Sequence, residues 1–478
     1  MSAESSSVSL STEEAEEVLE ISAFKGLEKE DFYHGLLPAE DATKLLQRNG
    51  DFLLRAEDME DGKGRQVCVS IRWQTESYNV PFVTSTKGCT LNGVHFSSSA
   101  ADLVRQHKNL NIAVCNPRSL DVVPITGIHR QEWELRHDQV TLTKKLGEGA
   151  FGEVHLGTLA IAGKTIRVAV KQSKGDVNKE QIQEMMREAR LMRQYKHLNI
   201  VRFFGVAAEK EPVMIVMEFV GGGALNSYLK KGIGTITPKH KAAMCYDAAC
   251  GLAYLHEHGC IHRDVAARNC LVVEKTHLVK ISDFGLSTKS RQYVMDKNER
   301  APIRWLAPEV MKSATFEQPA DTWSYGVLCW EIFADGTVPY NEFTTADLQK
   351  MIHEPDFRLQ MRADTPKDVT KTVQRCWNAK PSDRPGMKDV AAALLKFSTQ
   401  DLEARKKKKE LKKQKKKEDC KKKKPKGAKT SSRCPRSRSP AKKSAPKPAA
   451  GKQKSARRSS DASASPCSTP AKSARKKR

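Results

Sequence analysis

The sequence predicts the α+β fold class, with two folded units in series and a disordered basic tail. Within residues 31–121 an amphipathic helical segment alternates with strand-like segments, and residues 140–398 combine alternating apolar strands with longer helical stretches. Residues 399–478 are rich in Lys, Ser, Ala and Pro and contain no aromatic side chain, so they cannot build a core. These three observations divide the chain into two domains and a tail.

The net charge of the chain lies in that tail. Residues 401–478 carry 31 Lys and Arg against 6 Asp and Glu, a net of +25, which equals the formal net charge of the whole chain. Such a polycation attracts anionic lipid, nucleic-acid phosphates or acidic polymers, or serves as a nuclear address; the plainer alternative is a solubilising segment. Without an aromatic stacking platform, nucleic acid is a weaker expectation than an anionic membrane surface. We expect a basic helix over 402–418 and disorder beyond it.

The segment from His262 to Asn269, H-R-D-V-A-A-R-N, places an acid, a base and an amide within eight residues. Asp264 can accept the proton of an incoming hydroxyl group, and Asn269 can hold a metal ion on nucleotide phosphates. The run A-A-R, in place of a lysine two residues after the aspartate, favours tyrosine over serine or threonine as the acceptor. This segment predicts a site that phosphorylates hydroxyl groups.

Further motifs follow the order that such a site requires. Residues 146–154 read L-G-E-G-A-F-G-E-V, and glycines there let backbone N–H groups approach triphosphate oxygens. A strand-like V-A-V-K ends at Lys171, whose ammonium would neutralise the α- and β-phosphates. Glu188 lies in a segment of helical periodicity and can pair with Lys171. D-F-G begins at Asp283, a carboxylate for Mg²⁺, and A-P-E ends at Glu309.

Together these motifs make residues 140–398 resemble a protein tyrosine kinase domain. The resemblance implies two lobes, the first mostly antiparallel strands with one helix and the second mostly helical. It implies ATP as the phosphate donor and Mg²⁺ as the cofactor, with Mn²⁺ as an alternative. The catalytic residues that it implies are Asp264, Arg268, Asn269, Lys171 and Glu188, and the metal-binding residues are Asn269 and Asp283. The implied ATP-binding residues are Leu146, Gly147, Glu148, Gly149, Ala150, Phe151, Gly152, Glu153, Val154, Ala169, Lys171, Met217, Glu218, Val220 and Leu271.

Other positions of the resemblance concern charge and regulation. Arg268 would supply the positive charge that serine/threonine kinases take from their lysine, and Arg384 would pair with Glu309. Tyr293 is the only tyrosine between D-F-G and A-P-E and is the candidate autophosphorylation site. A phosphate there could pair with nearby cations and order the loop. Those cations are Arg263, Lys289 and Arg291. The alternative is an exposed loop tyrosine without a role.

Residues 31–121 carry a second set of motifs. The stretch Y-H-G-L-L-P leads into a helix that we expect near Pro38, the alternating strand G-D-F-L-L-R ends on Arg55, and Ser99 is expected to cap a later helix. This arrangement resembles an SH2 domain. In that family the strand arginine binds phosphotyrosine bidentately, so Arg55 would bind phosphotyrosine proteins.

The module departs from the SH2 pattern around this arginine. Ala39 stands where a helix arginine usually gives a second phosphate contact. Acidic residues occupy the following loop, where small hydroxyl residues often stand: Glu57, Asp58, Glu60 and Asp61. Acid repels a dianion, and losing one charge-assisted contact costs about 1.5–3 kcal/mol. Lys63 and Arg65 are candidates for compensation. The alternative is a module kept for contacts with the kinase domain.

The order of SH2 module, linker at 122–139 and kinase domain resembles the Fes/Fer group of non-receptor tyrosine kinases, as do the strings Y-H-G-L-L-P and C-I-H-R-D-V-A-A-R-N-C. In that group the SH2 domain is seated against the kinase N-lobe and supports the helix of the Lys–Glu pair. Residues 133–135, W-E-L, are expected to pack on that lobe. Residues 1–30 are acidic and Ser-rich and are expected to be disordered, and the long N-terminal helical module of the group is not expected.

We therefore expect a non-receptor protein tyrosine kinase that transfers the γ-phosphate of ATP to tyrosine hydroxyls of protein substrates. The alternative is an ATP-binding scaffold, recruited by its basic tail, without meaningful turnover. Residue 2 is Ser, no signal peptide or long apolar run is seen, and the 12 cysteines show no C-x-x-C spacing. These features favour a cytoplasmic location, with the inner plasma membrane surface and the nucleus as further sites.

Overall fold

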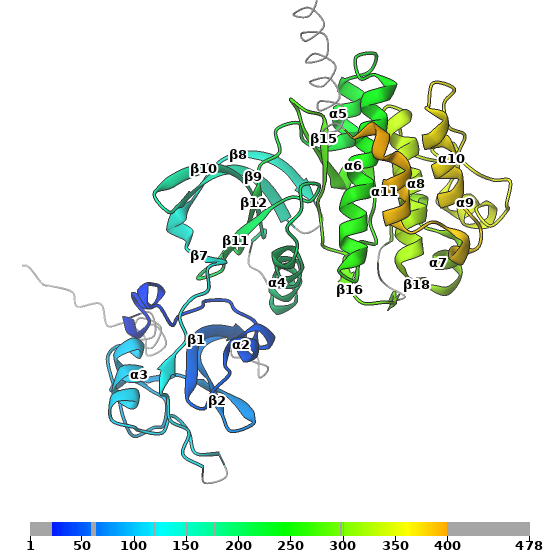
Figure 1. Cartoon of the computed structure of the whole chain (residues 1–478). Coiled ribbons are helices and arrows are strands. Elements are labelled where there is room, and N and C mark those ends of the chain that lie inside the picture. Colours follow the sequence, from blue (N-terminus) through cyan, green and yellow to red (C-terminus); the bar gives the residue numbers. More distant parts are fainter. Residues whose placement is uncertain are drawn as a thin grey trace, which may run out of the picture. The chain divides into compact units, whose positions relative to one another are not determined.

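The computed structural model describes residues 22–58, 64–117, 120–149, 152–175, 178–296, 299 and 301–398. We treat them as an N-terminal module, residues 22–130, and a two-lobed region, residues 131–398 (Figure 1). The helix expected at 402–418 and the disorder expected in the tail lie outside the described residues. Within the described residues, no helix is long and apolar enough to cross a membrane.

The N-terminal module is built on a mixed sheet of strand order β3-β2-β1-β6. Its strands are β1 (Asp51–Asp58), β2 (Arg65–Trp73), β3 (Glu76–Pro81) and β6 (Thr126–Gly127), with a separate hairpin of β4 (Val83–Ser85) and β5 (Gly88–Thr90), and with helices α2 (Ala39–Leu45) and α3 (Ala100–Asn109). As expected, Ser99 caps α3: its hydroxyl oxygen accepts a hydrogen bond from the amide of Asp102, at 3.3 Å.

Strand β1 is buried on both faces because the sheet lies between two apolar clusters. Leu53 packs in a cluster with Ala42 and Leu46 on the side of α2. Its neighbours Phe52 and Leu54 belong instead to a cluster shared with α3. Alternation along a strand sends successive side chains to opposite faces, so Arg55 shares the face of Leu53 and α2.

The expectation that residues 1–30 are all disordered is wrong for the last nine of them. Residues 22–30 include the short helix η1 (Leu27–Lys29). Ala23 and Leu27 are buried in the module's core, at 6% and 4% exposure. Burial of these two apolar side chains holds the segment against the module.

The first lobe of the two-lobed region is a six-stranded sheet with one helix, α4 (Lys179–Gln194), beside it (Figure 1). Its strand order is β7-β11-β12-β10-β9-β8. The strands are β7 (Glu134–Leu135), β8 (Val140–Gly149), β9 (Gly152–Ile161), β10 (Lys164–Gln172), β11 (Phe203–Ala207) and β12 (Met214–Glu218). All neighbours pair antiparallel except β7, which runs parallel to β11.

The predicted linker at 122–139 contributes to both sheets. Its β6 pairs with β1 in the N-terminal module, and its β7 pairs with β11 in the first lobe. The carbonyl of Trp133 accepts a hydrogen bond from the amide of Val206 at 2.8 Å, and Leu135 is buried with Leu159 and Val168. The expectation that residues 133–135 pack on this lobe is confirmed.

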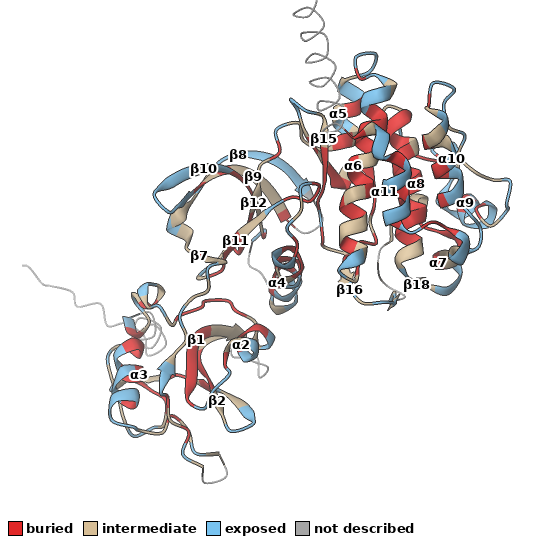
Figure 2. Ribbon diagram, viewed as in Figure 1, coloured by how far each residue is buried: buried red, intermediate tan, exposed pale blue. Residues whose placement is uncertain are grey.

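The second lobe is mostly helical, as the sequence predicts. Its helices are α5 (Leu225–Lys231), α6 (Pro238–Glu257), α7 (Pro308–Ser313), α8 (Gln318–Phe333), α9 (Thr345–Met351), α10 (Lys367–Cys376) and α11 (Met387–Leu394). Short strand pairs are β13 (Cys260–Ile261) with β16 (Thr288–Lys289), β14 (Cys270–Val273) with β15 (Leu278–Ile281), and β17 (Tyr293–Val294) with β18 (Thr315–Phe316). Helix α8 is buried over most of its length (Figure 2), so it provides a rigid support for the loops around it.

Candidate functional site

The loop between β13 and β14 is held by a buried carboxylate on α8. Asp321 accepts hydrogen bonds from the backbone amides of His262, at 2.7 Å, and Arg263, at 2.9 Å. It also contacts the ring of His256 at 3.0 Å. Arg263 has a positive φ of 69°, a conformation that side chains rarely adopt without such support. The hydrogen bonds to Asp321 on α8 therefore fix the backbone before Asp264 and set the direction in which the Asp264 side chain points.

Asp264 is held by the two residues that its motif supplies. The side-chain nitrogen of Asn269 donates to its carboxylate at 2.7 Å and to its backbone carbonyl at 2.9 Å. Arg268 donates to the other carboxylate oxygen. Burial raises the pKa of the Asp264 carboxyl above its usual value, although Arg268 and Asn269 act in the opposite direction. The carboxylate is thus positioned, partly desolvated and a better proton acceptor than an exposed aspartate.

Lys171 on β10 and Glu188 on α4 form the expected ion pair, with 2.7 Å between ammonium and carboxylate. Burial raises the pKa of Glu188 against the influence of Lys171. For Lys171 burial acts downward, but the carboxylates of Glu188 and Asp283 raise its pKa above the usual value. The ammonium is therefore charged and fixed by a helix, which suits it to hold phosphate oxygens.

Asp283 follows β15 and has a positive φ of 63°. The amide of Gly285 donates to its carboxylate at 3.3 Å, and the residue is exposed. Asn269 uses its amide nitrogen on Asp264, which leaves its amide oxygen for a cation. Carboxylate and amide oxygens are ligands that a hard divalent cation prefers, so these two residues fit a magnesium ion.

The glycine-rich segment forms the turn between β8 and β9, with Gly149 paired to Gly152. Gly152 has a φ of 140°, and a Cβ there would lie 2.1 Å from the carbonyl oxygen of Gln172, so only glycine fits. Ala150 and Phe151 lie outside the described residues. Glu148 and Glu153 pair with Lys145 on the surface, so only their backbone is left for a nucleotide.

The remaining predicted nucleotide residues come together from both lobes. In the sheet register, Val154 pairs with Lys171 and Ala169 with Met217. The amide of Glu218 donates to the carbonyl of Arg202 at 2.8 Å, and β12 ends there. Val220, just after β12, is buried, and Leu271 lies on β14. Leu146 and Gly147 lie on β8 at the start of the glycine-rich segment, and Leu146 is 46% exposed.

Two glutamates that sequence reasoning missed also contact this region. Glu331 on α8 accepts hydrogen bonds from the indole N–H of Trp305, at 2.8 Å, and from the amide of Ala267, at 3.0 Å. Burial raises its pKa to about 7. An acid within the apolar run V-L-C-W-E-I-F was the available signal for Glu331. The second, Glu299, has no such signal in its polar loop.

Glu299 lies between the candidate autophosphorylation site and Arg263. The hydroxyl of Tyr293 donates to its carboxylate at 2.9 Å, and Arg263 forms an ion pair with the same group. The guanidinium carbon of Arg263 lies 3.7 Å from the centroid of the Tyr293 ring. Of the other cations expected here, Lys289 instead donates to Gln194 at 2.7 Å. The second-lobe ion pair of Arg384 with Glu309 is present in bidentate form, at 2.6 and 2.7 Å.

Arg55 lies within β1 of the N-terminal module, three residues before the strand ends at Asp58, and makes a network of buried polar contacts. It is 1% exposed and donates to Ser70, to the carbonyl of Leu37 and to Glu57. The module also contacts the kinase-like lobe: Asp41 pairs with Arg190 of α4. Arg65, a candidate for phosphate compensation, instead joins Asp58 to Glu211 in the loop between β11 and β12. Lys63, Glu60 and Asp61 lie outside the described residues.

Comparison with known proteins agrees with this geometry. Residues 140–394 match the family model described as protein tyrosine and serine/threonine kinase. Fer-related kinase 1 of Caenorhabditis elegans is 36% identical over 371 residues, which cover 77% of this chain and 93% of that protein. Human tyrosine-protein kinase Fer is 34% identical over 382 residues, 77% of this chain but 44% of its own length. The transforming protein Fps of avian sarcoma virus strain PRCII is 35% identical over 375 residues, 78% of this chain and 68% of that protein. The chain therefore belongs to the protein kinase family, in the group of the Fer and Fps tyrosine-protein kinases.

Proposed function

We propose that this protein is a non-receptor tyrosine kinase that transfers the γ-phosphate of ATP to tyrosine hydroxyls of protein substrates. The observation that carries the proposal is the position of Asp264, whose two carboxylate oxygens are held by Arg268 and Asn269. The same structure keeps the Lys171–Glu188 pair closed at 2.7 Å. A scaffold without turnover has no need of both arrangements.

The mechanism follows from charge and position. The oxygen of the substrate hydroxyl attacks the γ-phosphorus while Asp264 accepts the hydroxyl proton, and the bond from that phosphorus to the β–γ bridging oxygen breaks, so that ADP leaves. The raised pKa of Asp264 makes it a stronger base. Lys171 holds the α- and β-phosphates, and the amides of the glycine-rich turn hold the outer oxygens. A magnesium ion bound by Asn269 and Asp283 would supply positive charge to the phosphate oxygens. Positioning and electrostatics therefore provide most of the catalysis.

Acceptor preference follows from the wall beside Asp264. Ala266 is buried and small where a serine/threonine kinase has a lysine, which leaves room for an aromatic ring. The guanidinium of Arg268 lies 4.3 Å from the ring centroid of Trp305, and Glu331 holds that indole. This stack fixes Arg268 so that its charge acts near the acceptor oxygen.

The test is an assay of the purified protein with ATP, Mg²⁺ and a poly-Glu/Tyr substrate, read with an anti-phosphotyrosine blot. We expect the wild type to phosphorylate tyrosine and Lys171→Met not to do so. The two proteins should have the same melting temperature in the absence of ATP. Wild-type turnover no higher than the Lys171→Met background, together with normal ATP binding, would favour the scaffold alternative.

The N-terminal module is proposed to act as an SH2 domain that docks phosphotyrosine proteins through Arg55. Support comes from its sheet between two helices and from the placement of Arg55 on the inner face of β1. Its contacts with the first lobe, through Asp41 to Arg190 and Arg130 to Glu209, support a second role in holding α4. The two roles separate experimentally: Arg55→Ala should abolish phosphopeptide binding, and Asp41→Asn should lower kinase activity.

Tyr293 is proposed as an autophosphorylation switch. In the unphosphorylated loop Glu299 occupies the guanidinium of Arg263 and accepts from the tyrosine hydroxyl. Although burial acts upward, hydrogen bonds from Arg263 and Tyr293 lower the pKa of Glu299, so its carboxylate stays charged. A phosphate on Tyr293 would repel this carboxylate and take its place on Arg263. Glu299 thus stands in for the phosphate until transfer occurs.

The basic tail is proposed to attach a cytoplasmic kinase to anionic membrane surfaces. Support comes from its net charge of +25 over residues 401–478. Co-sedimentation with liposomes containing phosphatidylserine, with and without residues 401–478, tests this directly. Binding should require the tail and weaken as salt rises, whereas equal binding of both proteins would contradict the proposal.

A further inference from the structure

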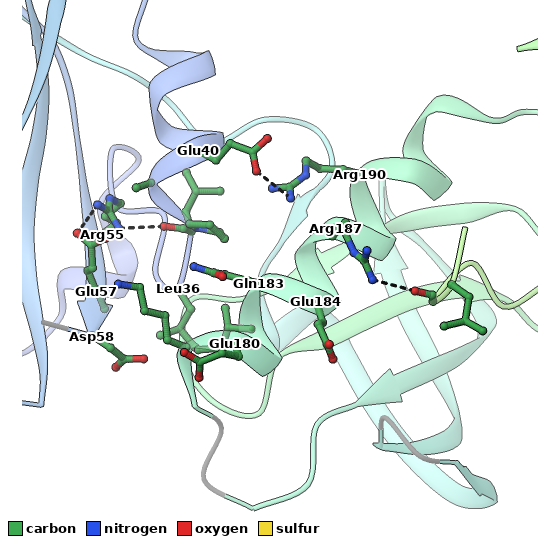
Figure 3. Close-up of a pocket in the computed structure, with 18 of the residues that line it drawn as sticks. Leu36, Glu40, Arg55, Glu57, Asp58, Glu180, Gln183, Glu184, Arg187 and Arg190 are labelled. Atoms are coloured by element: carbon green, nitrogen blue, oxygen red, sulfur yellow. Dashed lines mark hydrogen bonds and ion pairs between the residues drawn. The ribbon is translucent and has the colours of Figure 1, made fainter. Parts of the chain in front are cut away.

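The guanidinium of Arg55 is already engaged on each of its three nitrogens. Its Nε donates to the hydroxyl of Ser70 at 2.8 Å, and one terminal nitrogen donates to the carbonyl of Leu37 at 3.3 Å. The other terminal nitrogen forms an ion pair with the carboxylate of Glu57. Figure 3 shows Arg55 directed at Glu57, with dashed lines to that carboxylate and to the backbone carbonyl of Leu37, just before α2. The charged partner of this arginine is therefore internal.

The strand dictates this pairing. Arg55 and Glu57 are two residues apart on β1, so their side chains leave the same face. Both are held in the ladder with β2, Arg55 opposite Cys68 and Glu57 opposite Gln66. Asp58 points the other way and pairs with Arg65. The regular backbone of β1 therefore places the side chain of Glu57 beside that of Arg55, and the pair forms without the movement of any loop.

Burial makes the pair strong. The side chain of Arg55 is 1% exposed and that of Glu57 is 19% exposed, so water screens their attraction much less than at a surface. The pair lines one end of a cavity of about 1330 Å³, whose wall in the N-terminal module also includes Leu37, Ala39 and Asn79. The opposite wall includes α4, and the cavity extends to residues of the second lobe. Ala39 brings no charge to this wall. A phosphate entering the cavity would meet Arg55 only after displacing Glu57, and would then lie beside a released carboxylate.

We propose that Glu57 is a built-in competing ligand for Arg55 that lowers the affinity of the SH2 module for phosphotyrosine. The inference rests on the proposed phosphotyrosine docking through Arg55 and states how that docking is regulated. Monovalent phosphotyrosine ligands are held weakly, and docking becomes effective where the phosphate is present at high local concentration, as when it is tethered beside the kinase.

The test measures fluorescence polarisation of the full chain with a degenerate phosphotyrosine peptide library, for the wild type, four single variants and one double variant. Glu57→Gln keeps the shape of the side chain and removes its charge, and Glu57→Ser replaces the acid by a short hydroxyl group. Glu76→Gln is the matched control, because it makes the same Glu-to-Gln charge change at an exposed position of β3 that does not line the cavity. Arg55→Ala gives the background from the basic tail, and the unphosphorylated library gives the background from the peptide.

We expect Glu57→Gln and Glu57→Ser to lower the Kd for the phosphorylated library roughly tenfold to hundredfold, the range of one charge-assisted hydrogen bond. Glu76→Gln should change it less than threefold, and Arg55→Ala placed in the Glu57→Gln background should remove the gain. Thermal melting of each variant confirms that the module is folded.

Other outcomes separate this inference from the proposed docking. Binding that depends on Arg55 but is equal in wild type and both Glu57 variants overturns the competing ligand and leaves the docking proposal standing. An equal gain in Glu76→Gln also overturns it, because the effect would then come from the general charge of the module. Absence of Arg55-dependent binding in every variant overturns both.

Discussion

Two arginines in different parts of this molecule, Arg55 and Arg263, are each buried and each paired with a glutamate. Arg263 pairs with Glu299, which lies in a loop 36 residues later in the chain. Arg55 pairs with Glu57, only two residues away on the same strand. The hydroxyl that would carry the competing phosphate differs as well. Tyr293 belongs to this chain and its hydroxyl donates to Glu299. In the docking that we propose, the phosphotyrosine for Arg55 is carried by another protein.

The difference determines what each pair does. At Arg263 the phosphate would be covalently attached next to its site, so its local concentration is high and Glu299 can be exchanged for it. At Arg55 an external ligand must overcome the same kind of ion pair with only its own binding energy. We therefore propose that the pair at Arg263 serves as a switch and that the pair at Arg55 raises the threshold for docking.

The largest expected effect isolates the chemistry from both arginine sites. Asp264→Asn should reduce kcat by about 10²- to 10⁴-fold, because the proton acceptor is lost while its hydrogen-bonding shape is kept. Phosphopeptide binding by the module should be unchanged, since the side chains that hold Asp264 are Arg268 and Asn269 and neither belongs to the module. Steady-state kinetics and polarisation on the same preparation check both statements. A parallel fall in peptide affinity would mean that the two regions are not separable as described.

The next effect tests Glu299 as a substitute for phosphate. Tyr293→Phe should remove the rise in activity after preincubation with ATP and keep a basal rate, because Glu299 still holds Arg263. In Tyr293→Phe/Glu299→Gln the basal rate should fall a further tenfold or so, as the arginine loses its charged partner. Initial rates on poly-Glu/Tyr measure both. A double variant as active as Tyr293→Phe would exclude Glu299 as a substitute for phosphate. A Tyr293→Phe variant that still responds to preincubation would exclude Tyr293 as the switch.

The last effect is on stability and leaves activity aside: it concerns Glu331, a buried glutamate whose two hydrogen-bond donors are neutral. Burial raises the pKa of Glu331 to about 7, above its ordinary 4.5, so the folded protein binds its proton more tightly than the unfolded chain. Between these two pH values the free energy of unfolding should fall as pH rises, by about 1.4 kcal/mol per pH step of one. Glu331→Gln should lack this slope in denaturation experiments from pH 4.5 to 7. A slope of equal size in the variant would assign it to other groups.

Much of the site was predictable because its motifs are short and local. The pairing of Lys171 with Glu188, the cap at Ser99 and the packing of residues 133–135 all followed from patterns within a few residues or from the family resemblance. Residues 22–30 were not predicted, because two buried apolar side chains in an acidic stretch give no periodic signal. The engagement of Lys289 by Gln194 was also missed, since it joins residues 95 apart.

The sequence by itself determined the kinase family and predicted the acid, the amide and the lysine that we propose to act on the phosphates. These follow from contiguous strings in which spacing alone sets the chemistry. Only the tertiary structure decided which anion each buried arginine holds. Glu299 contacts Arg263 across a folded loop. Glu57 pairs closely with Arg55 because β1 is buried on both faces around Arg55, where little water is present to screen the charge. Burial and long-range proximity are properties of the packed chain and have no signature in a local string of residues.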